Sequence, residues 1–300
     1  MLENLVKQLI EIVGEEYVKT NEPMESHCTF RCGGKAAVYV IPGSIDEVVA
    51  VVKAIRGAEV PFMVIGNGSN LLVRDEGYKG VLVEIGSRIA MIDIIGEDIV
   101  VDAGAKLSAT ANAAMESDLA GMEFAHGIPG NVGGAVAMNA GAYGGEMAQI
   151  IKWVKVLDQN NEIQTLSLEE LELGYRSSRI QKEQLIVLQT RLGLELGSAG
   201  EIAMIMQMLM SKRRAKQPLE YPSAGSTFKR PEGHFAGKLI EDAGLRGYTV
   251  GGAQVSEKHC GFVINYDHAT ATDIIQLMDD VQKKVQEQFD VTLEPEVKII

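Results

Sequence analysis

The sequence predicts an α+β protein of more than one domain, organised around glycine-rich loops. At 300 residues the chain is long enough for two or three domains, each with its own core. Hydrophobic residues make up 46% and charged residues 23%, which is typical of a globular protein. Strand and helix patterns follow one another along the chain, and no internal repeat is present. Segment 126–145, HGIPGNVGGAVAMNAGAYGG, interrupts these patterns with seven glycines.

The first half of the chain predicts a βαβ unit followed by further strands. Residues 1–16 predict an amphipathic helix, because apolar residues recur at helical spacing at Leu2, Leu5, Leu9 and Ile12/Val13. Ser44-x-x-Glu47 is a capping box, so a helix is expected from there to Gly57. The other expected elements are strands at 37–41, 62–65, 81–85, 89–95 and 99–103 and a helix at 107–118.

The second half predicts a hairpin and then a separate C-terminal region. Strands at 151–158 and 162–166 flank a turn at Asn160–Asn161. A boundary is expected near Gly197–Gly200, before a Met-rich helix whose last turn carries Lys212, Arg213, Arg214 and Lys216. The other expected elements are helices at 168–173, 201–216, 236–243 and 272–289, strands at 185–190, 248–255 and 261–265, and a final strand containing Glu296.

Composition and charge exclude several classes of function. A net charge of −13 argues against non-specific nucleic-acid binding, which needs a basic surface. Cys28-x-x-x-Cys32 lies beside His27 without a second ligand pair, so structural thiols are favoured over a metal site, and three cysteines do not make a disulfide framework. The acidic N-terminus lacks a signal-peptide pattern, and no apolar run approaches the length of a membrane span. We therefore expect a cytoplasmic protein without membrane insertion, nucleic-acid partner or metal.

The glycine-rich segment 126–145 is the strongest local signal. Glycine at this density is poor material for a helix or strand, and it is typical of backbone that approaches a phosphate closely. A flexible linker is the alternative, but linkers are polar and this segment carries Ile128, Val132, Val136 and Met138. A second loop, Gly66-Asn67-Gly68-Ser69-Asn70, follows the strand at 62–65, where a hairpin-like turn is the alternative. Together the two loops predict a diphosphate-containing cofactor or ligand.

Three isolated polar residues are candidates for chemistry. Arg176 lies in a Gly-Tyr-Arg-Ser-Ser turn, Ser226 follows Gly225, and Glu296 follows Pro295 in an apolar stretch. Taken singly, each has an ordinary alternative: a surface arginine, a turn serine and an edge-strand glutamate facing water. The basic cluster 212–216 has two interpretations as well, phosphate binding or cations that complement a helix dipole. Composition and spacing alone lead to an α+β protein that binds an anionic, nucleotide-type ligand.

The combination of motifs goes further. GIPGNVGGAVAMNAGAYG, IGNGSNLL, GYRSS, AGSTFKRP and LEPEVKII occur in this order, and together they closely resemble the UDP-N-acetylenolpyruvoylglucosamine reductase family. The resemblance covers residues from about 29 to 300 and points to the shorter, type II variant, because no tyrosine-bearing loop is inserted between GYRSS and AGSTF. Asn131 departs from the threonine that many relatives carry.

The resemblance implies a two-subdomain FAD-binding fold of the vanillyl-alcohol-oxidase (PCMH) type plus a C-terminal α+β substrate-binding domain. It places FAD-binding subdomains at residues 1–85 and 86–198 and the substrate domain at 199–300. It also implies that NADPH reduces FAD, which then reduces the enolpyruvyl ether of UDP-N-acetylglucosamine to UDP-N-acetylmuramate for peptidoglycan. A monomer is expected.

The resemblance also assigns roles to individual residues. Arg176 would bind a carboxylate, a protonated Glu296 would stabilise the enol, and Ser226 would donate a proton, directly or through a relay such as Lys229. Substrate binding is expected at Tyr175, Lys212, Arg213 and Lys229. Lys212, Arg213 and Lys216 are candidates for the substrate diphosphate or the NADPH phosphate, with a solvated helix end as the alternative. FAD contacts are expected at Gly66, Asn67, Gly68, Ser69, Asn70, Gly130, Asn131, Gly133, Gly134, Ala135, Asn139 and Gly141.

Two alternatives remain at this point. One is another FAD oxidoreductase of the same fold, in which His126 beside the glycine loop is a candidate for a covalent flavin tether. The other is a non-catalytic UDP-sugar-binding protein, which we expect to lose Ser226 or Glu296, whereas this chain keeps both.

Overall fold

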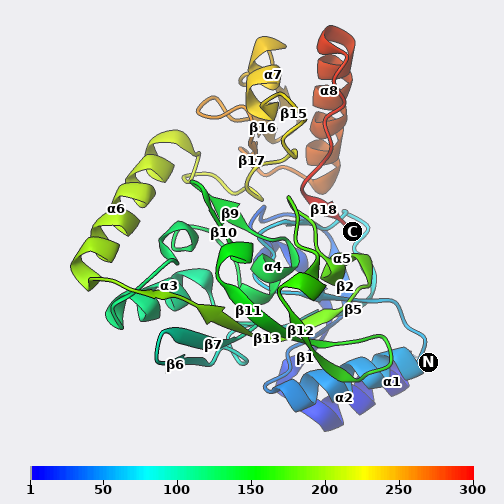
Figure 1. Cartoon of the computed structure of the whole chain (residues 1–300). Helices are drawn as coiled ribbons and strands as arrows, with labels where there is room; N and C mark the ends of the chain where they lie inside the picture. The colour runs from blue at the N-terminus through cyan, green and yellow to red at the C-terminus, as the bar shows by residue number, and fades with distance from the viewer. Residues whose placement is uncertain (1) are drawn as a thin grey trace. The chain divides into compact units, whose positions relative to one another are not determined.

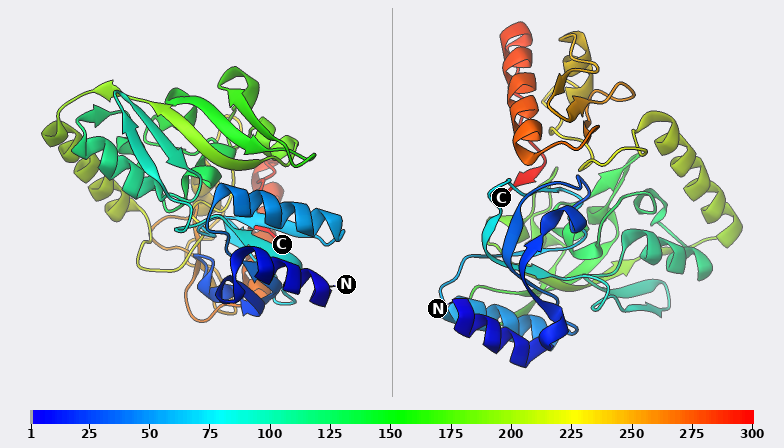
Figure 2. Two further views of the ribbon diagram at one scale, coloured as in Figure 1. Left: turned by 90° about the horizontal axis from the view of Figure 1, so that it is seen from below. Right: turned by 180° about the vertical axis from the view of Figure 1, so that it is seen from behind.

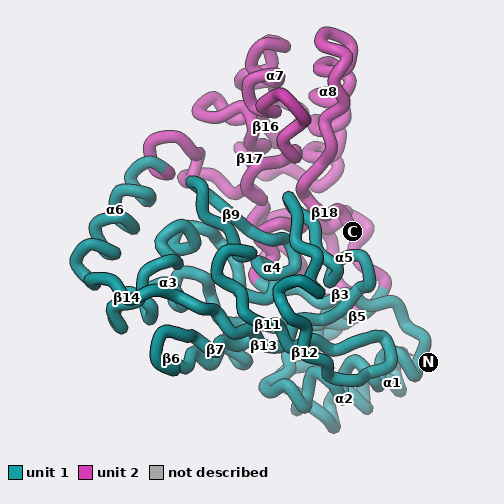
Figure 3. The backbone as a smooth tube through the Cα atoms, viewed as in Figure 1, with its two compact units in different colours: residues 1–20, 38–66, 80–212 teal, residues 21–37, 67–79, 213–300 magenta. Residues whose placement is uncertain are grey.

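The computed structural model describes residues 2–300. Internal contacts divide the chain into two compact units (Figure 3). Unit 1 comprises residues 1–20, 38–66 and 80–212, and unit 2 comprises residues 21–37, 67–79 and 213–300. The predicted division at residues 85 and 198 stays a prediction. No helix among residues 2–300 is long and apolar enough to span a membrane.

Unit 1 contains most of the sheet structure (Figures 1 and 2). A five-stranded antiparallel sheet has the order β12-β11-β13-β7-β6, and a four-stranded sheet has the order β1-β2-β5-β3. The larger sheet's strands are β6 Ile92–Ile95, β7 Asp98–Asp102, β11 Ile151–Leu157, β12 Ile163–Ser167 and β13 Ile186–Gly193. The smaller sheet's strands are β1 Val18–Pro23, β2 Lys35–Val40, β3 Phe62–Ile65 and β5 Tyr78–Glu84, of which β1, β2 and β5 each begin or end within the residue ranges of unit 2. Short pairs are β8 Leu119–Ala120 with β14 Glu195–Leu196, and β9 Gly141–Ala142 with β10 Gly145–Glu146.

Two helices lie side by side in the N-terminal part of unit 1, α1 (Leu2–Val13) and α2 (Ile45–Gly57) (Figures 1 and 2). The predicted apolar face of α1 is buried at Leu5, Leu9 and Val13. The Ser44 Oγ accepts from the amide of Glu47 at 3.1 Å, so α2 begins where the capping signal predicts. Unlike a simple βαβ unit, the sheet places β5 between β2 and β3.

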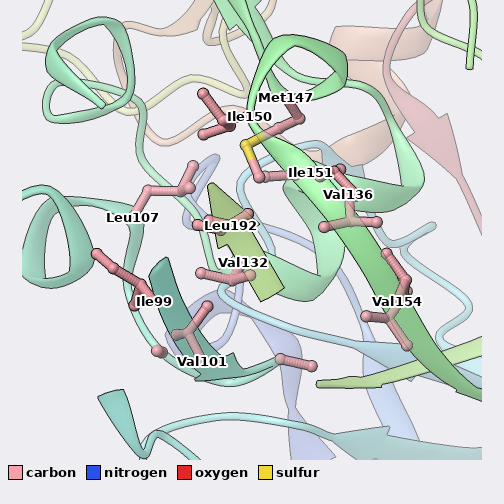
Figure 4. Close-up of a cluster of buried hydrophobic side chains, with 14 of the residues drawn as sticks. Ile99, Val101, Leu107, Val132, Val136, Met147, Ile150, Ile151, Val154 and Leu192 are labelled. Atoms are coloured by element: carbon pink, nitrogen blue, oxygen red, sulfur yellow. The ribbon is translucent and has the colours of Figure 1, made fainter. Parts of the chain in front are cut away.

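The largest core of unit 1 lies between its main sheet and the helices α3 (Leu107–Glu116) and α4 (Val132–Ala137) (Figure 4). Val132 of α4 lies near Val101 and Leu192, and Val136 lies near Ile151. Unit 1 also contains α5 (Arg179–Lys182) and most of α6 (Ala199–Lys216). The short helix predicted at 168–173 is a 3-10 turn at Glu169–Leu171.

Helix α4 corrects one expectation, because the glycine-rich segment does form a helix there. Val132, Ala135 and Val136 are buried and stand at i, i+3 and i+4, so one face of the turn packs into the core. Packing of that face outweighs the poor helix propensity of Gly133 and Gly134.

Unit 2 combines the C-terminal region with two short earlier segments. Its elements are β4 Leu71–Leu72, α7 Ala236–Asp242, β15 Thr249–Val250, β16 Ala253–Val255, β17 Val263–Asn265, α8 Ala271–Phe289 and β18 Lys298–Ile299. The carboxylate of Asp75 accepts from the amides of Ala271 and Thr272, both at 2.9 Å, which binds segment 67–79 to the start of α8. Parallel pairing of β4 with β18 binds the same segment to the C-terminus. The final strand is shorter than predicted, and Glu296 lies just before it.

Candidate active site

At the start of α4 in unit 1, the amides of Val132 and Gly133 donate to the carbonyls of Ala105 and Ala103, both at 2.8 Å. Asn131 occupies the N-cap position, but its side chain does not cap the helix and instead donates to the carbonyl of Ile85 at 3.1 Å. Gly66, from the other glycine loop, faces Asn131, because a Cβ on Gly66 would lie 3.4 Å from that side chain. Gly134, in the first turn, is exposed, and a Cβ added there would meet no atom within 4 Å. The open position of this turn is therefore Gly134, where a ligand could approach the backbone closely.

Neighbouring glycines are required by the protein's own packing. A Cβ on Gly133 would lie 2.8 Å from the Cβ of Ala103, whose carbonyl also accepts the Gly133 amide at 2.8 Å. In unit 2, Gly68 has φ +60°, and a Cβ there would clash with the carbonyl of His27. Substitution at Gly133 or Gly68 would therefore disturb folding, whereas substitution at Gly134 would test a ligand.

Arg176 lies at the tip of a tight turn in unit 1. The amides and carbonyls of Gly174 and Ser177 bond reciprocally at 3.0 and 3.2 Å. Arg176 has φ +52°, the left-handed region that non-glycine residues enter at a cost. Its half-buried guanidinium lies 5.1 Å from the ring centroid of Tyr175, which is 55% exposed. The turn thus holds an arginine in a costly conformation beside an exposed aromatic ring.

Buried polar side chains bind this turn to the glycine-rich segment. The amide of Asn139 donates to the carbonyl of Gly174 at 3.2 Å, and its Oδ1 accepts from Ala148 at 2.9 Å. The Oγ of fully buried Ser178 donates to the carbonyl of Ala137, the last residue of α4, at 2.7 Å. The structure therefore holds the turn that carries Arg176 against the C-terminal end of α4 within unit 1. Sequence reasoning missed Ser178, because a serine in a turn carries no distinctive pattern.

In unit 2, Ser226 and Glu296 lie on paired segments. The amide of Glu296 donates to the carbonyl of Thr227 at 2.9 Å, and Phe228 forms an isolated antiparallel bridge with Pro295. The side-chain amide of Asn70 donates to the carbonyl of Glu296 at 2.9 Å, so the second glycine loop joins the same group. Ser226 is exposed and Glu296 half-buried.

The predicted basic contacts differ in their surroundings. Lys212 ends unit 1 and is exposed, whereas Arg213 begins unit 2, is only 8% exposed and donates to the Oε1 of Gln217 at 3.3 Å. The Nζ of Lys229 pairs with the Oε1 of Glu294 at 2.7 Å. Because Arg213 is buried, we interpret its side chain as part of the packing around α6. The charge of Lys212, in contrast, is exposed.

The cysteines are buried free thiols. Burial raises the pKa of Cys28 above its ordinary value and that of Cys32 to about 12. The Sγ of Cys28 donates to the carbonyl of Cys32 at 3.2 Å. Neutral thiols of this kind are inert packing groups.

One buried atom beside the glycine-rich segment lacks a partner. The Nδ1 of His126 is buried and has no hydrogen-bond partner among residues 2–300. A buried polar atom without a partner calls for a ligand or ordered water. Together with the open position at Gly134, it fits a polar cofactor at this segment.

Comparison with known proteins assigns a class to this arrangement. Residues 36–167 match the FAD binding domain, and residues 217–300 match the UDP-N-acetylenolpyruvoylglucosamine reductase C-terminal domain. A 4-ethylphenol oxidase from Gulosibacter chungangensis shares the fold at 17% identity, with a TM-score of 0.50 over 95% of this chain and 63% of that chain. The fold thus defines an FAD-binding protein of the vanillyl-alcohol-oxidase type, and the predicted fold class is confirmed.

Full-length relatives then fix the family. The UDP-N-acetylenolpyruvoylglucosamine reductase of Caldanaerobacter subterraneus subsp. tengcongensis is 50% identical over 300 residues, covering 100% of this chain and 99% of that protein. The corresponding reductase of Clostridium perfringens strain SM101 is 50% identical over 98% of this chain and 96% of its own. The crystal structure of the reductase from Thermus caldophilus matches at 35% identity with a TM-score of 0.80, covering 92% of this chain and 97% of that chain. The chain belongs to the UDP-N-acetylenolpyruvoylglucosamine reductase family, and its length fits the shorter variant.

Proposed function

We propose that this protein reduces the enolpyruvyl ether of UDP-N-acetylglucosamine to UDP-N-acetylmuramate in peptidoglycan precursor synthesis, with NADPH as reductant. The observation that carries the proposal is the linkage of Ser226 to Glu296 through Thr227, within the region that matches the family's C-terminal domain. Retention of Arg176, Ser226 and Glu296 together favours the reductase over a non-catalytic UDP-sugar-binding protein. A monomer in the cytoplasm is part of the same proposal.

The cofactor proposed for this site is FAD. Gly134, exposed at the start of α4, would lie against its diphosphate. Gly66 lies beside Asn131 and would contribute to the same contact. When bound, FAD supplies a hydride acceptor for NADPH and a hydride donor for the vinyl carbon of the substrate.

Arg176 and Glu296 are proposed to stabilise the charge that hydride addition leaves on the substrate. Addition of a hydride to the terminal vinyl carbon moves the electron pair of the double bond toward the carboxylate, giving an enolate. The guanidinium of Arg176 can bind that carboxylate with two parallel hydrogen bonds. A protonated Glu296 would donate a hydrogen bond to the enolate, whereas an ionised carboxylate would oppose it.

Ser226 is proposed to complete the reduction. Its Oγ proton would pass to the carbon that bears the carboxylate, so that one hydride and one proton add across the double bond. Water then returns a proton to the serine oxygen. The Nζ of Lys229 pairs with Glu294, and we assign Lys229 to substrate binding together with Tyr175 and Lys212, whereas the buried Arg213 belongs to the packing around α6.

Stopped-flow measurement of the two half-reactions tests this function. The parent protein should be yellow, and NADPH should bleach the flavin before the enolpyruvyl UDP-sugar restores its colour. Ser226→Ala should leave flavin content and bleaching by NADPH intact, because those steps need no serine hydroxyl. The recolouring step should slow by about a hundred- to ten-thousandfold, the usual contribution of a general acid.

Ser226→Cys is the matched control, because a thiol can still donate a proton and should recover part of the loss. A parent protein that carries no FAD, or whose reduced flavin is not reoxidised by the enolpyruvyl sugar, would refute the proposed reaction. Equal effects of Ser226→Ala on both half-reactions would remove Ser226 from the proton-donor role.

A further inference from the structure

We infer that Thr227 is a positioning residue whose side-chain hydroxyl sets the placement of Ser226 and Glu296. The inference rests on the proposed function for its catalytic consequence and on hydrogen bonds within unit 2 for its structural part. Thr227 is fully buried, directly follows Ser226, and all three of its polar groups have partners.

Thr227 forms a junction between two segments of unit 2. Its amide donates to the carbonyl of Gly261 at 2.9 Å, and its Oγ1 accepts from the amide of Val263, also at 2.9 Å. Both bonds attach Thr227 to the edge of β17 that faces away from β16. Its own carbonyl accepts from the amide of Glu296 at 2.9 Å on the other side.

The hydroxyl supplies one of the three bonds of this junction, the one to Val263. Segment 222–227 runs antiparallel to 261–265, because Asn265 donates to Pro222 and Thr227 to Gly261, and in such a ladder the carbonyl of residue 227 would accept the amide of Gly261. The Gly261 amide instead donates to the Nδ1 of His259, so the carbonyl of Thr227 accepts the amide of Glu296 while Oγ1 accepts that of Val263. A residue without a hydroxyl leaves the buried amide of Val263 without this acceptor, which is costly and loosens the attachment of the segment that holds Glu296.

The surrounding bonds make the junction rigid. The carbonyl of Glu296 accepts from the side chain of Asn70, and the backbone amide of Lys229 donates to the backbone carbonyl of Glu294 at 2.8 Å. The segment that carries Glu296 is therefore held by further bonds beside its bond to Thr227. On the other side, the Nδ1 of His259 accepts the amide of Gly261 at 3.0 Å. Ser226 is exposed, so its position is set by the backbone of its buried neighbour Thr227.

The test compares Thr227→Val, which keeps shape and removes the hydroxyl, with Thr227→Ser, which keeps the hydroxyl. Thr190→Val is the matched control, because Thr190 is equally buried and its Oγ1 donates to the carbonyl of Trp153 at 2.9 Å in unit 1. Each variant is assayed as the full flavin-loaded protein for the two half-reactions. Amide hydrogen exchange is followed by mass spectrometry in peptides covering 225–229 and 294–297.

Thr227→Val should slow flavin reoxidation by the enolpyruvyl sugar by about ten- to a hundredfold, the range expected for misplacement by about 1 Å. Flavin reduction by NADPH should stay within about twofold of the parent, because it precedes protonation. Exchange should accelerate in both peptides, while Thr227→Ser and Thr190→Val should resemble the parent in both readouts.

Two results would overturn the inference. One is unchanged exchange in peptides 225–229 and 294–297 of folded Thr227→Val. The other is a Thr227→Ser variant as impaired as Thr227→Val, which would make the hydroxyl irrelevant. If the parent protein itself fails to reduce the enolpyruvyl sugar, the proposed function fails, and the exchange data alone then decide whether Thr227 holds Glu296.

Discussion

Gly134→Ala separates cofactor binding from folding more cleanly than any other change in the glycine-rich segment. A Cβ at Gly134 meets no protein atom within 4 Å, and its backbone lies outside the left-handed region. Alanine in a helix is favoured over glycine by about 0.5–1 kcal/mol, so the apoprotein should be as stable as the parent or slightly more stable. The added methyl group instead occupies the space where a bound diphosphate would approach the backbone most closely.

The expected loss can be expressed through ligand linkage. At FAD concentrations of about 100 times the parent Kd, binding stabilises the folded state by about 2.7 kcal/mol. A tenfold weaker Kd reduces this to about 1.4 kcal/mol, so the FAD-dependent gain in stability shrinks by about 1.3 kcal/mol. Apoprotein is prepared by removal of flavin, and Kd is measured by quenching of FAD fluorescence. Urea unfolding with and without FAD measures the linked stabilisation.

Gly57→Ala is the matched control, because Gly57 ends α2 and a Cβ there also meets nothing within 4 Å. It should gain similar apoprotein stability and keep the parent Kd for FAD. A folded Gly134→Ala protein that binds FAD as tightly as the parent would refute the proposed cradle at α4. Gly133→Ala cannot replace this test, because its Cβ would crowd Ala103 and lower stability without any ligand.

Three further predictions concern the polar residues. Arg176→Lys should raise KM for the enolpyruvyl sugar and lower kcat, because lysine cannot bind a carboxylate with a planar fork, and steady-state kinetics would show an unchanged KM if Arg176 were only a surface residue. Ser178→Ala should cost about 1 kcal/mol of stability in urea unfolding, because α5 loses its cap and the carbonyl of Ala137 loses a donor; no loss would contradict this role. Burial lowers the pKa of His259 below its ordinary value. The part of the stability that depends on its neutral ring is therefore complete above the unfolded-state pKa of about 6.5, and it is lost as pH falls through the lower folded-state pKa. His259→Asn, which can still accept the Gly261 amide, should therefore reduce the loss of stability between about pH 6.5 and 5, and equal acid sensitivity in both proteins would exclude His259.

Local signals predicted the elements whose residues carry their own pattern. The strand at 62–65 has the predicted bounds, and the spacing of Leu5 and Leu9 identified the buried face of α1. Ser44 marked the start of α2, because an N-cap hydroxyl acts within one turn. These elements follow from interactions between residues close in sequence.

The features that sequence reasoning missed depend on distant partners. Helix α4 forms because Val132 and Val136 pack into a core built from strands much further along the chain. Segment 67–79 belongs to unit 2 because Asp75 binds the start of α8, about two hundred residues later. No local periodicity encodes such pairings, so a single sequence does not reveal them.

What the activity of a variant reveals about a residue depends on whether that residue is a buried polar group. Asn139, Ser178 and Thr227 are almost fully buried, and a buried polar group must keep its partners, so each permits essentially one local geometry. Arg176 is half-buried and Ser226 is exposed. Both are positioned by backbone that the three buried side chains hold in place. Substituting the buried set should therefore change stability and rate together, whereas Ser226 should change rate alone. A loss of activity is evidence for chemistry only where stability has been measured on the same variant and is unchanged.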